Sequence, residues 1–193
     1  MSYSLPLFPL QTVVFPGGLL PLKVFEPRYM EMVTQVISER ASFGICAIYE
    51  GRETDMSVKH HAVGTQVQVI DWDMPQPGIL HIQTRALERI VVRTSHKEAN
   101  GLLIGEVEDV SVETATAVPP ELTLSAEILH QIIKEIGADK FAQPHDYANA
   151  VWVSYRLSEV LPLKLSIRQN LLEMNDSVAR LTILTDFLKK QTN

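Results

Sequence analysis

The spacing of apolar positions along the chain changes near residue 115. Before this position, apolar residues alternate with polar ones in several segments, such as residues 63–69, and a period of two is typical of strands with one buried face. After it, apolar residues recur every three or four positions, which is typical of amphipathic helices. The pattern predicts a β-rich domain over residues 1–115 and a helical domain over residues 116–193.

The β-rich part is predicted to contain several short strands and one inserted helix. Gly17 follows Pro16 and can supply the positive φ that the third position of a type II turn requires. Pro27 suits the first position of a helix, where its missing N–H costs nothing, and Tyr29 and Val33 begin the apolar face of that helix. Closing the strands into a barrel or half-barrel would remove their exposed edges. The segments predicted to be extended are residues 13–15, 19–25, 43–49, 64–72, 78–83, 87–94 and 102–112.

The helical part follows a joint at residues 114–120 that is rich in small residues and proline. Its first apolar stripe, over residues 125–136, ends at Gly137, a residue that suits a helix C-terminus. The residues predicted to begin the following helices are Asp146, Ser166 in a capping box with Gln169, and Asn175 or Asp176. The predicted fold class is therefore α+β, with a C-terminal helical bundle after the β-rich domain.

Residues 1–22 carry no charge, which raises the question of a membrane segment. Prolines interrupt this stretch at positions 6, 9, 16 and 21, and a spanning helix needs about 20 apolar residues in unbroken helical conformation. A secretory signal places Lys or Arg before its apolar core, whereas the first basic residue here is Lys23. We therefore predict a cytoplasmic protein with no membrane partner.

The sequence contains none of the common motifs for nucleotide binding or hydrolysis. It has no G-x-x-x-x-G-K-[ST] or G-x-G-x-x-G loop, no G-x-S-x-G elbow and no H-E-x-x-H helix.

Cys46, the single cysteine, lies in an apolar run that favours a buried, inert thiol in a reducing compartment. Adjacent His60 and His61 would point to opposite faces of a strand. Asp71 and Asp73 would share a strand face as a cation site or acid/base pair, but solvent exposure at a strand end explains them more simply. We predict no cofactor, no metal site and no catalytic residue.

A basic track, Arg85, Arg89, Arg93 and Lys97, recurs every four residues and would share one face of an unbroken strand. The net charge of the chain is −6, which counts against nucleic acid as a partner because phosphate contacts dominate such binding. No aromatic residue lies within the track for base stacking. Ion pairs with acidic residues of segment 106–109 are the preferred interpretation, and RNA binding through residues 85–97 is the alternative.

Apolar residues also occur where turns are predicted. Such residues either plug the core, which is the usual case, or form an exposed patch that contacts other chains. The candidate peptide-binding residues of this kind are Phe15, Leu19, Leu20, Trp72 and Met74.

Three runs near the N-terminus carry a family resemblance: LPLFPL at residues 5–10, VFPG at residues 14–17 and PLKVFEPRY at residues 21–29. In this order they resemble the opening of the N-terminal, substrate-binding domain of ATP-dependent Lon proteases. Val63-Gly64-Thr65 resembles the next family element, and LPL at residues 161–163 resembles part of its helical end. One departure is Ala86, where the family usually has a glycine three residues before the retained Arg89.

The resemblance implies a PUA-like β pseudo-barrel followed by a helical bundle, and a role in recognising unfolded or damaged polypeptide. Lon enzymes also carry an ATPase module and a Ser/Lys peptidase module, and the sequence shows neither, so it resembles stand-alone members of the family. We therefore predict a non-enzymatic module of protein quality control that binds unfolded or apolar polypeptide without cleaving it. Its partners would be misfolded polypeptides and, in addition, a protease or a second copy of the chain.

Overall fold

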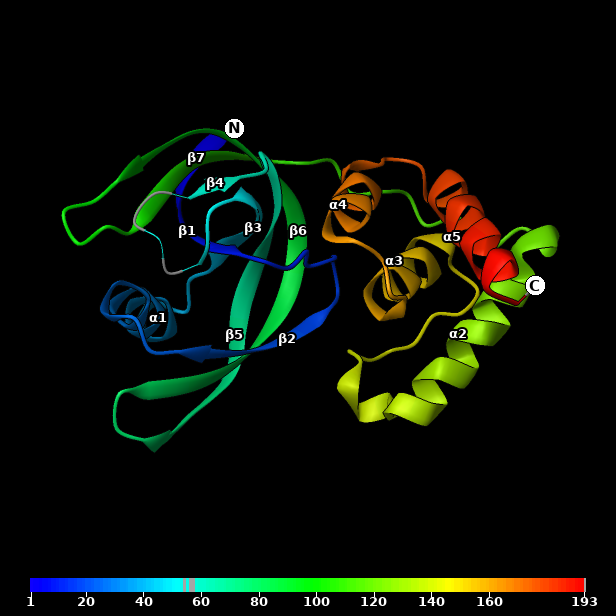
Figure 1. Cartoon of the computed structure of the whole chain (residues 1–193), viewed down its shortest axis with the longest axis horizontal. Helices are drawn as coiled ribbons and strands as arrows, with labels where there is room; N and C mark the ends of the chain where they lie inside the picture. Colours follow the sequence, from blue (N-terminus) through cyan, green and yellow to red (C-terminus); the bar gives the residue numbers. More distant parts are fainter. Residues whose placement is uncertain (54, 56–57, 193) are drawn as a thin grey trace. The chain divides into compact units, whose positions relative to one another are not determined.

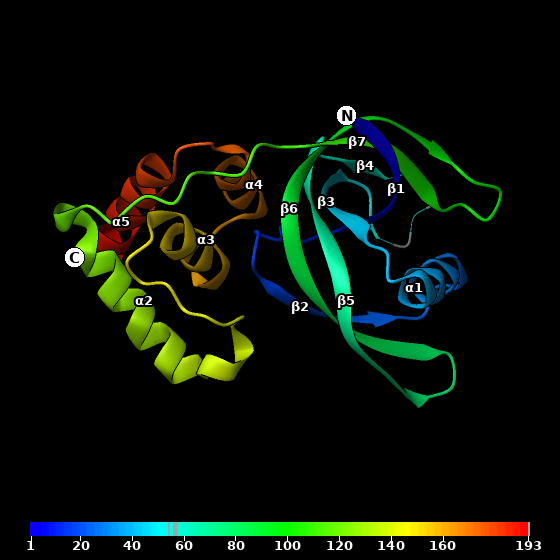
Figure 2. The same ribbon diagram turned by 180° about the vertical axis from the view of Figure 1, so that it is seen from behind.

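The computed structural model describes residues 1–192 apart from residues 54, 56 and 57. The chain divides into two compact units, Met1–Ser111 and Val112–Asn193, which Figures 1 and 2 show from opposite sides. The first unit contains the named β-strands and one α-helix, and the second contains helices joined by loops. The observed fold is therefore the α+β arrangement that the change of apolar spacing predicted.

A closed ring of strands forms the first unit. Around the ring, the strands follow the order β1, β7, β6, β5 and β3, and β1 closes it by pairing in parallel with β3. β2 pairs with β6, and β4 pairs with β3. The predicted pseudo-barrel with one inserted helix is confirmed. The elements are β1 (Ser2–Leu10), β2 (Leu19–Val24), α1 (Pro27–Glu39), β3 (Phe43–Glu50), β4 (Lys59–His60), β5 (Val63–Gln76), β6 (Ile79–Lys97) and β7 (Leu103–Asp109).

Two buried clusters hold this unit together. In one, Tyr29, Met32 and other residues of α1 pack on the strands, with the ring of Tyr29 stacked on Phe8 at 3.8 Å between centroids. The other cluster gathers Leu5, Leu7, Cys46, Ile90, Val92 and Val107. Gly64 allows the strands to approach closely, because a Cβ there would lie 2.4 Å from the carbonyl oxygen of Ile45.

The start of α1 explains the EPRY run at residues 26–29. Arg28 is buried and forms an ion pair with Glu26 at 2.9 Å across Pro27. It also donates to the carbonyl oxygens of Gly101 and Glu53, each at 3.3 Å. A buried guanidinium needs such partners, since an unpaired buried charge is costly. The run therefore positions the helix against the ring.

Three expectations about strands need correction. β1 begins at Ser2, whereas residues 13–15 belong to no strand. Segments 78–83 and 87–94 are parts of one strand, β6, because the main chain of Ala86 continues the pairing through bonds to Gly17 and Gly18. The Pro16–Gly17 turn is confirmed, with Gly17 at φ 75 and Gly18 N–H donating to the Phe15 carbonyl.

The second unit is a bundle of helices with its own apolar core. Gly137 ends α2 as predicted, at φ 113. The N-cap of α3 is Asn149 and not Asp146, and α4 starts after Lys164, so Ser166 lies inside that helix without a capping role. None of the described helices combines the length and apolar character that crossing a bilayer requires. The elements are η1 (Pro120–Leu122), α2 (Thr123–Ile136), η2 (Ala138–Lys140), α3 (Ala150–Val160), α4 (Leu165–Glu173) and α5 (Ser177–Thr192).

Candidate functional site

The β5–β6 hairpin carries exposed apolar side chains. Beyond Val69, the residues of β5 are all exposed, and Figure 1 shows the hairpin projecting from the ring. Ile70, Trp72 and Met74 are 49%, 56% and 45% exposed. We call these three residues the Trp72 surface. Large apolar side chains grouped on a monomer surface are typical of contact sites for other molecules.

Two grooves border Trp72. The first, with a volume of about 370 Å³, lies over β2, β5 and β6 and is lined by Leu22, Trp72 and Ile82 among others. The second, of about 190 Å³, runs from Ile70 and Trp72 to Ile37 of α1. Trp72 therefore lines both grooves.

Charged groups surround the first groove. Lys23, His81 and Asp73 lie opposite one another across β2, β6 and β5, and all three line the groove, as does Asp71. Both signs of charge are present, so the charge of the groove by itself does not select a strongly charged partner.

The structure separates the predicted contact residues. Trp72 and Met74 are exposed, whereas Leu19 and Leu20 are half-buried, and Leu20 packs against the core. Phe15 is 0% exposed, so the expectation that it lies on the surface is wrong. The Gly17–Gly18 main chain bonds to Ala86, and this pairing folds the loop onto the ring with Phe15 inside it.

Ile70 was not among the predicted contact residues. A usable signal was present, because residues 70–74 read Ile-Asp-Trp-Asp-Met, an alternation of apolar and acidic residues. An alternating strand has one face of each kind, and at a strand end beyond the core the apolar face has no partner within the chain. The acidic positions therefore marked the segment as solvated and its apolar positions as exposed.

The basic track does not form one face. Arg89 is buried, while Arg85 and Arg93 are exposed, because irregularities in the pairing of β6 near Thr65 and Val92 break the alternation. Arg93 binds Glu108 through Nε and Nη2, at 3.0 and 2.7 Å from Oε2, and this pairing lowers the pKa of Glu108. The preferred interpretation, an ion pair with the 106–109 segment, is confirmed for Arg93.

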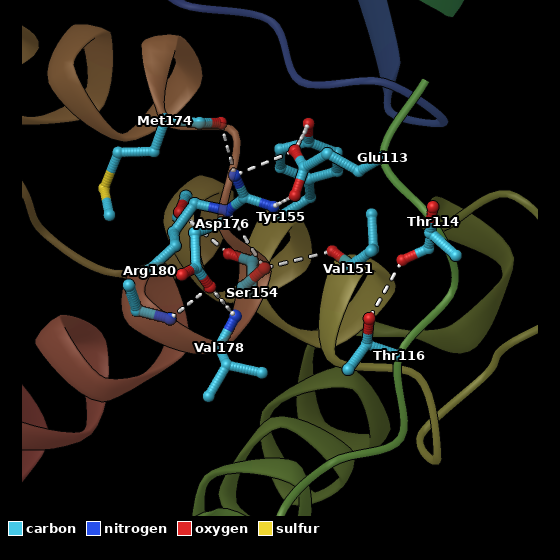
Figure 3. A network of polar contacts seen from close by, with 12 residues as sticks. Glu113, Thr114, Thr116, Val151, Ser154, Tyr155, Met174, Asp176, Val178 and Arg180 are labelled. Atoms are coloured by element: carbon cyan, nitrogen blue, oxygen red, sulfur yellow. Dashed lines mark hydrogen bonds and ion pairs between the residues drawn. The ribbon is translucent and has the colours of Figure 1, made fainter. Parts of the chain in front are cut away.

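A buried polar network lies in the second unit (Figure 3). Arg180 is 0% exposed and pairs with Glu113 through Nη1 and Nη2, at 3.0 and 2.9 Å. Its Nε donates to Ser154 Oγ at 3.0 Å, and Nη1 donates also to the carbonyl of Met174 at 3.0 Å. The guanidinium lies 4.0 Å from the centre of the Tyr155 ring, and Tyr155 Oη donates to Glu113. With its donors occupied and no solvent access, Arg180 has a structural role.

Two observations concern reactive side chains in the described residues: the burial of Cys46 and the spacing of potential metal ligands. Burial raises the pKa of the Cys46 thiol to about 12, so this thiol stays protonated and is a poor nucleophile at neutral pH. Outside residues 54, 56, 57 and 193, no group of three His, Cys, Asp or Glu side chains is arranged to hold a metal ion.

This chain resembles known proteins in family, in sequence and in fold. The family described as the ATP-dependent protease La (LON) substrate-binding domain matches residues 4–190. A crystal structure of a Lon N-terminal domain protein from Xanthomonas campestris is 34% identical, with a TM-score of 0.79, over 94% of this chain and 96% of that one. The N-terminal domain of a Mycobacterium avium complex Lon protease shares the fold, with 16% identity and a TM-score of 0.66 over 95% and 97% of the chains. The comparison with curated proteins found no match.

Proposed function

Because this chain belongs to the family of the Lon substrate-binding domain, we propose that it binds unfolded polypeptide at the Trp72 surface and does not cleave it. The observation that carries the proposal is the exposure of Trp72, at 56%, between two grooves. Tryptophan is one of the side chains enriched at the energetic centre of protein interfaces. An unfolded chain offers the apolar side chains that such a surface can bury.

The accessible area of Trp72 sets the scale of its contribution to binding. A tryptophan buries about 150–250 Å² in an interface, and roughly half of that is still accessible in Trp72. At about 25 cal/mol per Å², covering it yields on the order of 2–3 kcal/mol. Ile70 and Met74 add to this. A surface of this strength suits many apolar sequences, because no rigid hydrogen-bond pattern selects one of them.

Binding without cleavage is supported by the nature of the match. The family that covers residues 4–190 is a substrate-binding domain and supplies neither an ATPase nor a peptidase. The buried thiol of Cys46 and the enclosed Arg180 network offer no accessible nucleophile with a base. RNA binding, the alternative, loses its support because Arg89 is buried and Arg93 is paired with Glu108.

The proposal is tested by fluorescence titration with a reporter protein held unfolded by carboxymethylation of its cysteines. Replacing Trp72→Ser together with Met74→Ser is expected to weaken binding about 10- to 100-fold, which corresponds to roughly 1.4–2.7 kcal/mol. Ile183→Ser is the matched control, since Ile183 is 48% exposed in the second unit, and its affinity should stay near that of the parent.

Circular dichroism must show that each variant remains folded. Equal affinity of the parent and the folded double variant would contradict the assignment of the Trp72 surface. Release of reporter fragments by the purified chain would contradict binding without cleavage.

A further inference from the structure

One half of β1 has an open side. β1 pairs with β7 over Ser2 to Leu7 and with β3 only from Leu7 to Leu10. On the side away from β7, residues 2–6 pair with none of the strands in the described part of the chain. The ring is therefore closed at one end of β1 and open at the other.

A groove of about 560 Å³ lies along this open half. One wall is the sheet, where Pro6, Ile104 and His96 lie opposite one another across β1, β7 and β6. The facing wall is α1, which contributes Met32 and Val36. We call this the edge groove. Its size lies within the range of ligand-binding pockets, about 300–1,000 Å³.

The main chain of β1 borders the edge groove. Leu5 also lines it, although its side chain is buried in the cluster with Leu7 and Val107, so its backbone faces the groove. In an antiparallel pair, alternate residues turn their N–H and C=O away from the partner strand. Residues 2–5 can therefore offer hydrogen-bonding groups to an added strand, and Pro6, which lacks an N–H, limits the extent of this pairing.

The charge of the edge groove is acidic. Glu39 and Glu98 line it, and no Lys or Arg does so. Both carboxylates are exposed, and neither forms one of the ion pairs found within residues 1–192 outside positions 54, 56 and 57. Like-signed carboxylates at the rim of an apolar groove favour a partner that carries positive charge.

From these observations we propose that the edge groove binds an extended polypeptide segment in which apolar residues are flanked by lysine or arginine, added as a strand beside residues 2–5 of β1. The bound segment is a strand, because a helix pairs its own backbone N–H and C=O groups internally and would leave those at the open side of β1 without partners. The apolar side chains lie against Met32 and Val36 of α1, and the basic side chains reach Glu39 and Glu98. This site is separate from the Trp72 surface. Of the residues that line the edge groove, Val36 of α1 and Ala41, which follows that helix, also line a groove beside Trp72, and the others do not.

The test uses the full chain and a fluorescein-labelled decapeptide in which a central run of valines is flanked on each side by lysines. Binding, followed by fluorescence anisotropy, is expected to weaken at least tenfold when Glu39→Lys and Glu98→Lys are combined. The peptide with glutamate in place of lysine should bind at least tenfold more weakly to the parent chain. The control is Glu121→Lys with Glu127→Lys, which changes the net charge equally on exposed positions of the second unit.

Hydrogen exchange distinguishes strand addition from charge attraction alone. The amides of residues 2–5 that point away from β7 should exchange more slowly with the lysine peptide bound. The proposal is overturned by an absence of binding, by equal affinity of the Glu39/Glu98 variant and the parent, or by binding without protection of residues 2–5. Trp72→Ser with Met74→Ser should leave this peptide's affinity unchanged, so the two binding proposals can fail independently.

Discussion

At the residue scale, buried charged groups in this protein are held by partners from the same unit. Arg28 is paired with Glu26 in the first unit and Arg180 with Glu113 in the second. Removing one partner of such a pair leaves an uncompensated buried charge and typically costs about 3–5 kcal/mol. These arginines therefore stabilise the fold, whereas the side chain of Trp72 is 56% exposed.

Glu159 gives the second unit a dependence on pH. Burial raises the pKa of this carboxyl to about 7, although Arg156 and Arg168 act to lower it. The folded state thus holds a proton that the unfolded chain releases near pH 4.5. This contribution to stability is full below that pH and is lost as the pH rises towards 7.

We expect Glu159→Gln to reduce this loss. Between pH 5 and pH 7.5, the unfolding free energy of the parent should fall relative to that of the variant by on the order of 2 kcal/mol. Urea unfolding across this range measures it, with the exposed Glu127→Gln as control. Parallel pH curves for the parent and Glu159→Gln would contradict the role given to Glu159.

At the element scale, the observed N-termini of the helices show which of the predicted N-cap residues act as caps. Asp176 Oδ1 accepts from the N–H groups of Val178 and Ala179 at 3.0 and 2.9 Å, so its predicted role is confirmed. Asp146 has the same chemistry, but α3 begins later in the chain, with Asn149 as its cap. The side chain suits both positions, and the packing of the helix decides where its first turn lies.

Asp176→Ala should lower the unfolding free energy by about 1 kcal/mol, the usual contribution of an N-cap. Asp146→Ala is the matched control and should have little effect. The difference between the two midpoints of urea unfolding is the quantity to measure. Equal destabilisation by both variants would mean that Asp176 does not cap α5.

At the scale of the whole molecule, each unit has its own means of cohesion. The first has the closed ring and two buried clusters, and the second has a helical core with the Arg180 network. Both proposed binding surfaces belong to the first unit. Both proposals therefore place recognition on the ring, whose hairpin carries exposed apolar side chains and whose β1 has one unpaired side over residues 2–6.

A fragment of residues 1–111 is expected to fold alone, because it contains both partners of β1, namely β3 and β7. A fragment of residues 1–101 should not fold, because loss of β7 leaves residues 2–6 of β1 unpaired and opens the ring. Dispersion of amide signals in the NMR spectrum separates the two outcomes. Poor dispersion of the amide signals of the 1–111 fragment would show that the ring needs the second unit in order to fold.

The sequence by itself determined the passage from strands to helices along the chain, the helix that begins at Pro27, the Pro16–Gly17 turn, the stop at Gly137 and the family. These depend on local chemistry: the period of apolar positions, the φ that glycine permits and the ordered N-terminal motifs. Only the tertiary structure decided that Phe15 is buried while Trp72 is exposed, and that Arg89 and Arg93 differ. Alternation predicts that a strand has two faces, but the pairing register, its irregularities and the closure by β1 decide which side chains meet solvent.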